Sequence, residues 1–169
     1  MNYEEAKNEL IQEWGVLGSA WGINKTEAQI HGLLMISPEP LSVAEIMEEL
    51  QISRGNVSMS LRALMDWGIV YKKFKLNERK EFFASEKDVW ALATKVAEER
   101  QKRELKPVIK MLERIQNIKD ADAEKEEVNE LNKMSKELLK FAKQCDKVLK
   151  RFSNSDSNWF FSTLVKLIR

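Results

Sequence analysis

The sequence predicts a mainly α-helical protein that carries one small β-hairpin and ends in long helices. Its 169 residues include only 6 Gly and 3 Pro, which is few for a loop-rich β fold. Apolar residues recur at spacings of three and four along most of the chain, as on one face of an α-helix. Between Ile69 and Ser85, short β-branched and aromatic runs replace that period and indicate a hairpin.

Two helices are predicted in the first forty residues. The first covers residues 3–21 and ends at Gly22. The second opens at Asn24, which precedes Glu27 by three residues and so has the spacing of a capping box. The two prolines of segment 37–40 stop this helix, because proline cannot continue it.

Residues 41–68 are predicted to form two short helices joined by a tight turn at residues 51–52. Ser42 and Ser53 are natural N-caps, since a serine side chain accepts a hydrogen bond from a first-turn amide. Gly68 follows the second helix as a residue able to adopt the left-handed conformation. The expected buried face comprises Val43, Ile46, Met47, Leu50, Ile52, Val57, Leu61 and Leu64.

A basic hairpin follows over residues 69–85. The runs IVYKKFK and EFFAS are predicted strands, and LNERK forms the loop between them. The net charge of +1 says little, but its distribution is uneven. Residues 51–85 carry seven bases and three acids, whereas residues 1–50 carry two bases and nine acids. Such a local basic segment is expected of a surface that meets phosphate groups.

Two short helices followed by a basic hairpin have the order of a winged helix-turn-helix. We therefore expect the second helix to enter the major groove of double-stranded DNA and the hairpin, or wing, to contact the flanking backbone or minor groove. Gly55 would let the backbone approach DNA closely. The predicted DNA-contacting residues are Ser53, Arg54, Gly55, Asn56, Ser58, Met59 and Arg62 on the helix, and Lys72, Lys73, Lys75, Asn77, Arg79 and Lys80 on the wing.

The stretch SRGNVSMSLRALMDWGIV, followed by a wing ending in ERKEFF, resembles the GbsR branch of the MarR-like winged helix-turn-helix regulators. The preceding NKTEAQIHGLLMISPEPLSVAEIMEEL resembles the same branch, so the resemblance covers about residues 10–90. It implies a homodimeric bacterial or archaeal regulator, often a repressor and sometimes responsive to small molecules such as choline. The positions that match the DNA-reading segment are Ser53, Arg54, Gly55, Asn56, Ser58 and Arg62.

Two positions depart from the pattern. Gln51 stands where helix-turn-helix motifs often place glycine. The wing tip also lacks glycine, which leaves Asn77 to make the turn.

The C-terminal half is predicted to be helical throughout. Ser85 and Asp88 form a cap-like pair, residues 106–107 should kink or restart the helix, and a third segment starts near Asp122. A near-heptad seam on this segment comprises Val128, Leu131, Leu138, Ala142, Cys145, Leu149 and Phe152. After the polar linker 153–158, the apolar residues of a terminal helix include Trp159, Phe160, Leu164 and Ile168. The seam and this terminal helix expose too much apolar surface for a monomer and predict a homodimer.

These features divide the chain into a DNA-binding domain, residues 1–85, and a helical dimerisation or regulatory region, residues 86–169. We expect a sequence-specific regulator of transcription, a repressor that binds a pseudo-palindromic operator as a homodimer. The alternative is a winged-helix scaffold that binds other proteins. Salt-dependent affinity for duplex DNA distinguishes the two, because only the first should lose binding steeply as salt rises.

Other functional residues have simpler interpretations. His31 fits a core position, since no partner is spaced for a catalytic triad or metal site, and we expect no enzymatic activity, metal or cofactor. The lone Cys145 allows no intrachain disulfide, although it could form one between subunits, and it indicates a reducing compartment. We expect a cytoplasmic protein without membrane contact, because no apolar run approaches the ~20 residues needed to span a bilayer. Trp14, Trp21 and Trp90 could bind a quaternary ammonium effector through cation–π attraction, but such residues also form cores.

Overall fold

The structure, a computed structural model, describes residues 1–76, 78–120 and 123–154. The chain divides into two compact units, the first from Met1 to Leu92 and the second beginning at Ala93. The predicted fold class is confirmed, since the described residues are mainly helical and include a small antiparallel sheet. No helix in the described part of the chain is both long and apolar enough to cross a lipid bilayer.

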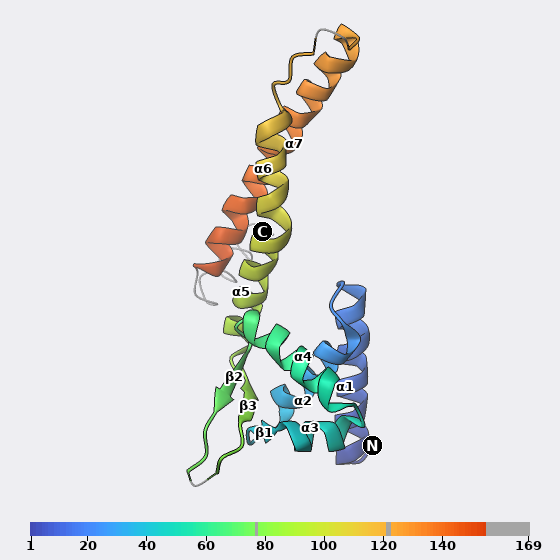
Figure 1. The fold of residues 1–169 in the computed structure, drawn as a ribbon, viewed down its shortest axis with the longest axis vertical. Coiled ribbons are helices and arrows are strands. Elements are labelled where there is room, and N and C mark those ends of the chain that lie inside the picture. Colours follow the sequence, from blue (N-terminus) through green and yellow to red (C-terminus); the bar gives the residue numbers. More distant parts are fainter. Residues whose placement is uncertain (77, 121–122, 155–169) are drawn as a thin grey trace, which may run out of the picture. The chain divides into compact units, whose positions relative to one another are not determined.

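The first unit combines helices with a small sheet (Figure 1). In chain order its elements are α1 (Tyr3–Ala20), α2 (Lys25–Ile36), β1 (Leu41–Ser42), α3 (Val43–Leu50), α4 (Arg54–Asp66), β2 (Val70–Lys73) and β3 (Phe82–Ser85). Within the described residues the strand order is β1-β3-β2. The two-residue strand β1 was not expected from the sequence. It pairs Leu41 with Phe83, so it ties the start of α3 to the base of the wing.

Helix α2 lies at the centre of the first unit. It packs against α1, α3, α4 and β3, and its Ile30, Leu33 and Leu34 are almost fully buried. The apolar side chains buried around it include Ile46, Val57, Leu61, Leu64, Val70, Phe82 and Phe83. The predicted inner face of α4 is therefore confirmed. The prediction was less accurate for the first helix and the turn, where the half-buried residues are Val43, Met47, Leu50 and Ile52.

A buried histidine joins three elements of this core. The Nε1–H of Trp14 on α1 donates to Nδ1 of His31 on α2 over 3.1 Å, and Nε2 of His31 lies 3.1 Å from Oγ of Ser85 on β3. An indole nitrogen can only donate, so Nδ1 accepts and the proton of the neutral ring is on Nε2. Ser85 Oγ accepts this proton and donates its own to the carbonyl of Glu86. The prediction that Ser85 caps the next helix was wrong, because its side chain is engaged in this chain of hydrogen bonds.

The second unit is built around a pair of helices. Helix α5 (Val89–Arg100) begins in the first unit, where Asp88 caps it by accepting a hydrogen bond from the amide of Ala91. It continues as a π-helical turn, η1 (Gln101–Leu105), into α6 (Lys106–Ile115), and α7 (Lys125–Ser153) follows. The expected break near residues 106–107 is this turn. Pro107 has no N–H to offer to the carbonyl four residues earlier, and a π turn changes the pairing at that point.

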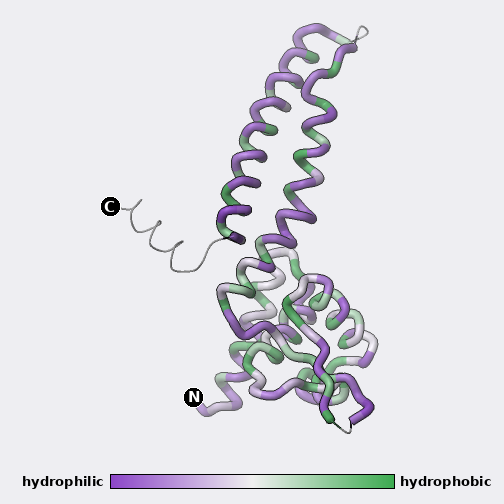
Figure 2. Tube along the Cα trace, turned by 90° about the vertical axis from the view of Figure 1, so that its left-hand side faces the viewer, coloured by the Kyte–Doolittle hydropathy of each residue, from purple (hydrophilic) through white to green (hydrophobic). Residues whose placement is uncertain are grey.

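Helices α6 and α7 share a small core. Leu112, Leu139 and Ala142 are buried there, and Leu105, Ile109 and Ile115 pack against them. In Figure 2, hydrophobic positions (green) recur at intervals along this helix pair between hydrophilic ones (purple). Beside this core, the buried Gln101 donates to the carboxylate of Asp146 over 2.7 Å, which connects η1 to α7.

The predicted seam on α7 was partly wrong because it combined two faces of the helix. Leu131 and Leu138, assigned to the seam, are 44% and 48% exposed, whereas Ser135 and Leu139 are buried. The face toward α6 includes small residues, so the largest apolar side chains do not mark it. They form a second stripe, which comprises Leu131, Met134, Leu138, Phe141 and Val148, with the half-buried Cys145 at the same spacing. The terminal-helix residues Trp159, Phe160, Leu164 and Ile168 lie outside the described residues.

The buried His31 makes folding sensitive to pH. Burial lowers the pKa of His31 from its ordinary 6.5 to about 4. Between pH 6.5 and 4 the unfolded chain takes up a proton on His31 that the folded chain does not. The free energy of unfolding is therefore highest above pH 6.5 and decreases as the pH falls toward 4. We expect the free energy of unfolding to decrease by about 3 kcal/mol over this window. Urea denaturation at a series of pH values measures it.

The control is His31→Gln, whose side chain cannot titrate and can still accept and donate hydrogen bonds. Carboxylates such as Glu45 titrate in both proteins, so the difference between the two curves isolates the histidine. The curve of His31→Gln should be flatter between pH 6.5 and 4.5. Parallel curves would show that His31 does not set the pH dependence.

Candidate nucleic-acid interface

The first helix of the helix-turn-helix is anchored by a capping box. The amide of Glu45 donates to Ser42 Oγ over 3.4 Å, and the amide of Ser42 donates to Glu45 Oε2 over 2.7 Å. The Ser42 hydroxyl also donates to Glu45 Oε2, and this bond, together with the one from the Ser42 amide, lowers the pKa of Glu45. The nearby positive charges of Lys80 and Lys75 lower it further. The predicted cap is confirmed. Since Ser42 also belongs to β1, the start of α3 is held next to the wing.

The turn between α3 and α4 explains the departure at Gln51. This residue adopts the left-handed conformation, with φ 52° and ψ 44°, so the backbone turns there without a glycine. Its side-chain amide donates to the carbonyl of Glu48 over 2.7 Å. The amide of Ile52 then donates to the carbonyl of Met47, and Ser53 caps α4 by accepting from the amide of Asn56.

Helix α4 presents a polar face to solvent opposite its buried face. The exposed positions on this side are Ser53, Arg54, Gly55, Asn56, Ser58, Met59 and Arg62, the set singled out in the sequence. A Cβ added at Gly55 would meet nothing nearer than Ser53 Oγ at 4.0 Å. Packing within the chain therefore does not require a glycine there. At the start of α4, Ser53 has a short side chain and Gly55 leaves the backbone accessible, and Arg54 and Arg62 lie on the same exposed side of the helix.

The wing projects a row of basic side chains from paired strands. Lys72, Lys73, Arg79 and Lys80 are exposed, whereas Lys75 is half-buried. The predicted turn residue Asn77 lies outside the described residues. Two exposed ion pairs lie within the wing, Lys72 with Glu81 at 2.6 Å and Lys80 with Glu78 at 3.2 Å. Exposed pairs contribute only about 0–1 kcal/mol, so both lysines can exchange these partners for phosphate.

Below the tip, the wing is fixed on an aromatic base. The ammonium groups of Lys75 and Lys80 lie 4.4 Å and 5.1 Å from the ring centroid of the buried Phe82. Cation–π attraction at these distances favours positions of the lysine side chains against the base of the hairpin.

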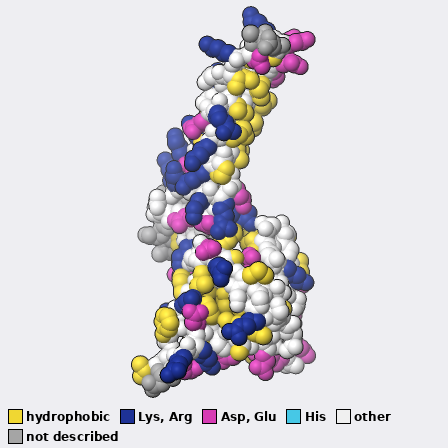
Figure 3. Space-filling model, in the orientation of Figure 1, with side chains coloured by type: hydrophobic (Ala, Val, Ile, Leu, Met, Phe, Trp, Pro, Cys, Tyr) yellow, Lys and Arg dark blue, Asp and Glu magenta, His cyan; other side chains and the backbone are white. Residues whose placement is uncertain are grey.

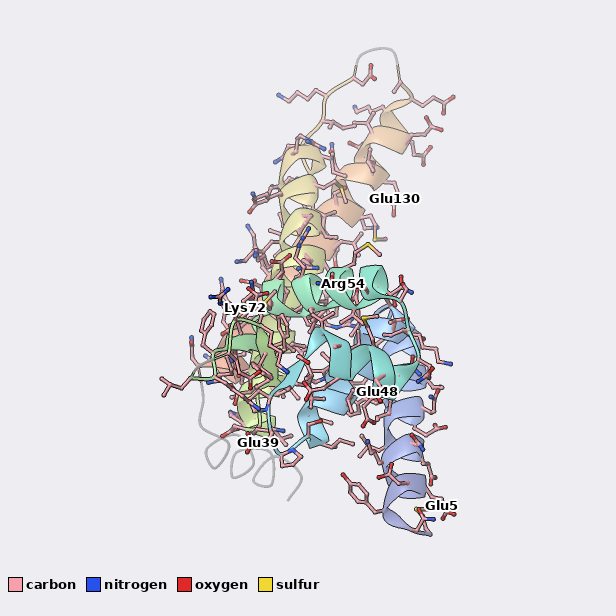
Figure 4. All side chains as sticks on the ribbon, turned by 60° about the horizontal axis from the view of Figure 1, so that its bottom comes forward. Glu5, Glu39, Glu48, Arg54, Lys72 and Glu130 are labelled. Carbon is pink, nitrogen blue, oxygen red and sulfur yellow. The ribbon has the colours of Figure 1, made fainter. Side chains whose placement is uncertain are left out.

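The wing and α4 meet at a shallow cleft of about 290 Å³. Its lining residues are Ser42, Val43, Ala44, Met47, Arg54, Lys80 and Glu81. The cleft brings together Arg54, at the start of α4, and Lys80, on the wing, which the sequence placed on separate elements. Figure 4 labels Arg54 on α4 and Lys72 on β2 of the same unit.

The sequence interpretation missed two residues of the wing. Phe74 and Leu76 are 80% and 92% exposed, immediately beyond the end of β2. Phe74 was counted with the predicted strand, where one face would be buried, and Leu76 with the predicted loop LNERK. Their exposure could have been inferred from the alternation with lysines, since Lys73 and Lys75 flank Phe74 in the sequence.

The tryptophans suggested for an effector occupy different environments. The Trp14 ring is half-buried, packs over Gly32 and lies 6.0 Å from the His31 ring, so it contributes to the packing of α1 on α2. Trp21 is exposed at the end of α1, and Trp90 is half-buried in α5. Effector binding by these residues stays a prediction. Among the described residues, no group of His, Cys, Asp and Glu is arranged to hold a metal ion.

Comparison with known proteins places this geometry among bacterial regulators. Residues 29–72 match the helix-turn-helix model of bacterial regulatory proteins of the arsR family. The chain is 24% identical over 161 residues to the putative HTH-type transcriptional regulator YvaV of Bacillus subtilis (strain 168), and the match covers 90% of both proteins. It is 26% identical over 113 residues to the HTH-type transcriptional repressor GbsR of the same organism, which covers 67% of this chain and 62% of GbsR.

The chain thus resembles winged-helix regulators of the GbsR type. The resemblance inferred from the recognition-helix sequence is therefore confirmed. The fold of this GbsR-like protein also matches the crystal structure of a transcriptional regulator, with a TM-score of 0.60 at 18% identity, over 89% of this chain and 99% of that one. The family match and the relatives together indicate a DNA-binding transcriptional regulator.

The left-handed Gln51 makes a direct prediction for stability. A non-glycine residue in this conformation costs about 1–2 kcal/mol, partly offset by the flexibility that glycine adds to the unfolded chain. Gln51→Gly should therefore raise the free energy of unfolding by about 0.5–1 kcal/mol despite losing an exposed hydrogen bond. Gln51→Ala, which loses that bond and keeps the strain, is the matched control and should give no gain. A Gly variant less stable than wild type in urea denaturation would refute this explanation of the turn.

Proposed function

We propose that the protein is a sequence-specific repressor of transcription that binds a pseudo-palindromic operator as a homodimer. The observation that carries this proposal is the meeting of Arg54 and Lys80 at one cleft. A base-reading helix and a phosphate-binding wing must present their charges from adjoining surfaces to engage the same duplex. Repression is supported by the likeness to GbsR, which is named a repressor.

The exposed face of α4 has side chains suited to base edges. An arginine can form two hydrogen bonds to guanine O6 and N7, and an asparagine can pair in the same way with adenine. Arg54 and Asn56 lie in the first turn of α4, where a recognition helix contacts bases. Arg62 lies two turns further along and is suited to a backbone phosphate. Lys72, Lys73, Arg79 and Lys80 would neutralise phosphates beside the recognition helix.

The second apolar face of α7 supports the homodimer. Its exposed residues are Leu131, Met134, Leu138, Phe141 and Val148. With the half-buried Cys145 between the last two, they follow the three–four spacing of a helix that pairs with another helix. Hydrophobic side chains (yellow) reach the surface along this unit in Figure 3. A second copy of the chain offers the same stripe, so two copies can cover each other's apolar surface and pair two wings. Residues 86–169, with support from residues 3–21, would then form the dimerisation region.

Two further parts of the proposal rest on likeness and chemistry. Repression of genes would place the protein in the cytoplasm. A quaternary ammonium compound is the proposed effector, because Trp14, Trp21 and Trp90 offer aromatic faces that attract such cations.

Separate variants distinguish base reading from phosphate binding. Arg54→Ala should weaken operator binding by about 1–3 kcal/mol and reduce discrimination against random duplex. Lys73→Ala should weaken binding to all sequences about equally and lower the salt slope by about one unit. The operator is first selected from a random duplex pool, and affinities are measured over a range of salt.

Lys136→Ala, an exposed lysine of α7, is the matched control and should change neither quantity. Equal loss on both duplexes for Arg54→Ala would remove the base-reading role of Arg54. If neither Arg54→Ala nor Lys73→Ala changes DNA affinity, a protein-binding scaffold replaces the proposed repressor.

The dimer is tested on the stripe itself. Phe141→Ala removes a large side chain that is 65% exposed in the single chain and would be buried in the pair. We expect the dimer dissociation constant to rise on the order of 100-fold, which corresponds to burying an aromatic side chain. Lys140→Ala, one residue away on an exposed position, should leave it unchanged. Analytical ultracentrifugation measures both. A monomeric wild-type protein would contradict the homodimer, and an unaffected Phe141→Ala dimer would move the interface elsewhere.

A further inference from the structure

The tip of the wing exposes apolar surface that the proposed contacts do not use. Phe74 is 80% exposed and Leu76 is 92% exposed, and both follow directly after β2. A Phe or Leu side chain left in water forgoes the favourable transfer of its apolar surface into a dry environment. Single exposed apolar residues are common on protein surfaces, but this pair lies two positions apart on a hairpin whose other residues are mostly charged.

The surroundings of this pair are cationic. Between residues 72 and 80 the basic residues are Lys72, Lys73, Lys75, Arg79 and Lys80, and the acidic residue is Glu78. In Figure 3, hydrophobic side chains (yellow) and basic side chains (dark blue) lie beside one another toward the far end of the wing. An apolar tip framed by cations matches a ligand with an anionic rim and an apolar interior.

The base of the wing is built to hold such a tip in place. Lys73 pairs with Phe82 at the last step of the β2–β3 ladder, and Phe82 is almost fully buried. Lys75 and Lys80 lie over the Phe82 ring from both arms of the loop. The tip therefore extends from a fixed point, next to the cleft that contains Arg54.

We propose that Phe74 and Leu76 form an apolar wedge that enters the minor groove of bound DNA and partly unstacks a base-pair step. This inference rests on the proposed function, since it requires that α4 and the wing bind a duplex. Minor-groove proteins insert apolar side chains, including Phe and Leu, between base steps and kink the duplex toward the major groove. The flanking lysines would bind the phosphates on either side of the groove.

The wedge adds a second source of sequence preference. Unstacking costs least at flexible pyrimidine–purine steps such as TA and CA. The operator should therefore carry such a step beneath each wing, although no hydrogen bond reads it. The wing would select for deformability while α4 reads base edges.

An anionic lipid surface also has a charged rim and an apolar interior. The duplex is favoured because Lys80 of the same wing lines the cleft with Arg54 of the recognition helix, so the wing that carries the tip adjoins a helix with base-reading chemistry. The membrane is one of the outcomes of the test.

The experiment compares full-length wild type with the double variant Phe74→Ala/Leu76→Ala and with Lys73→Ala. The duplex is the selected operator with 2-aminopurine at the step beneath the wing and a donor–acceptor dye pair at its ends. Wild type should raise 2-aminopurine fluorescence and bend the duplex by roughly 20–90°. The double variant should lose most of both signals and bind about tenfold more weakly, with an unchanged salt slope. Lys73→Ala should keep the bend and lower the salt slope by about one unit.

A second duplex, with a stiff A-tract at the wing position, checks the selectivity. Wild type should bind it about as weakly as the double variant binds the operator, because the wedge gains nothing there. Equal bending and fluorescence for wild type and the double variant would overturn the wedge and leave the repressor intact. Absence of wild-type binding to any duplex would overturn the proposed function itself. Loss of phosphatidylglycerol vesicle binding in the double variant, with DNA bending unchanged, would assign the tip to a membrane surface instead.

Discussion

The hydrogen-bonded chain from Trp14 through His31 to Ser85 is the interaction on which the arrangement of the winged helix depends. It connects α1, α2 and β3 within a mostly apolar core, and each of its donors has a matching acceptor. A buried polar group without a partner would cost about 1–3 kcal/mol, so these hydrogen bonds form in one combination only. Next to it, Lys87 donates to the backbone carbonyls of Leu34, Met35 and Ser37 and so caps the end of α2.

These contacts have a consequence for the proposed DNA-binding surface. Because β3 is held against α2, the base of the wing keeps its place relative to α4, which packs on the same helix. Glu81, the residue before that strand, pairs with Lys72 across the hairpin and lines the cleft with Arg54. Helix α4 and the paired strands of the wing are therefore in place before any duplex binds, which would reduce the entropic cost of association. The hydrogen bonds of His31 thus fix the relative positions of α4 and the wing, although His31 itself does not belong to that surface.

Local signals in the sequence predicted local features well. Ser42, Ser53 and Gly68 act as expected, because a helix cap depends on residues within a few positions. Features that depend on distant residues were missed or misassigned. Strand β1 exists because Leu41 pairs with Phe83, and Ser85 bonds His31, 54 residues earlier in the chain.

The errors at the wing and on α7 had a different cause. The spacing of apolar residues identifies the amphipathic faces of a helix or strand, but it does not show which face packs against the rest of the chain. On α7 the face toward α6 contains Ser135 and Ala142, while Phe141 and other large side chains point to solvent. On the wing, Phe74 fitted a strand pattern whose strand ends one residue earlier. The candidate site residues on α4 could be found from sequence because caps and the buried face determine which positions remain outside.

The central claim is that one surface, formed by α4 and the wing, binds DNA. Lysine acetylation footprinting by mass spectrometry, with and without selected operator duplex, tests it most directly. Bound DNA should protect the wing lysines Lys72, Lys73 and Lys80, while Lys136 and Lys140 of α7 react as before. Protection confined to the α7 lysines, or no protection anywhere at saturating DNA, would contradict it.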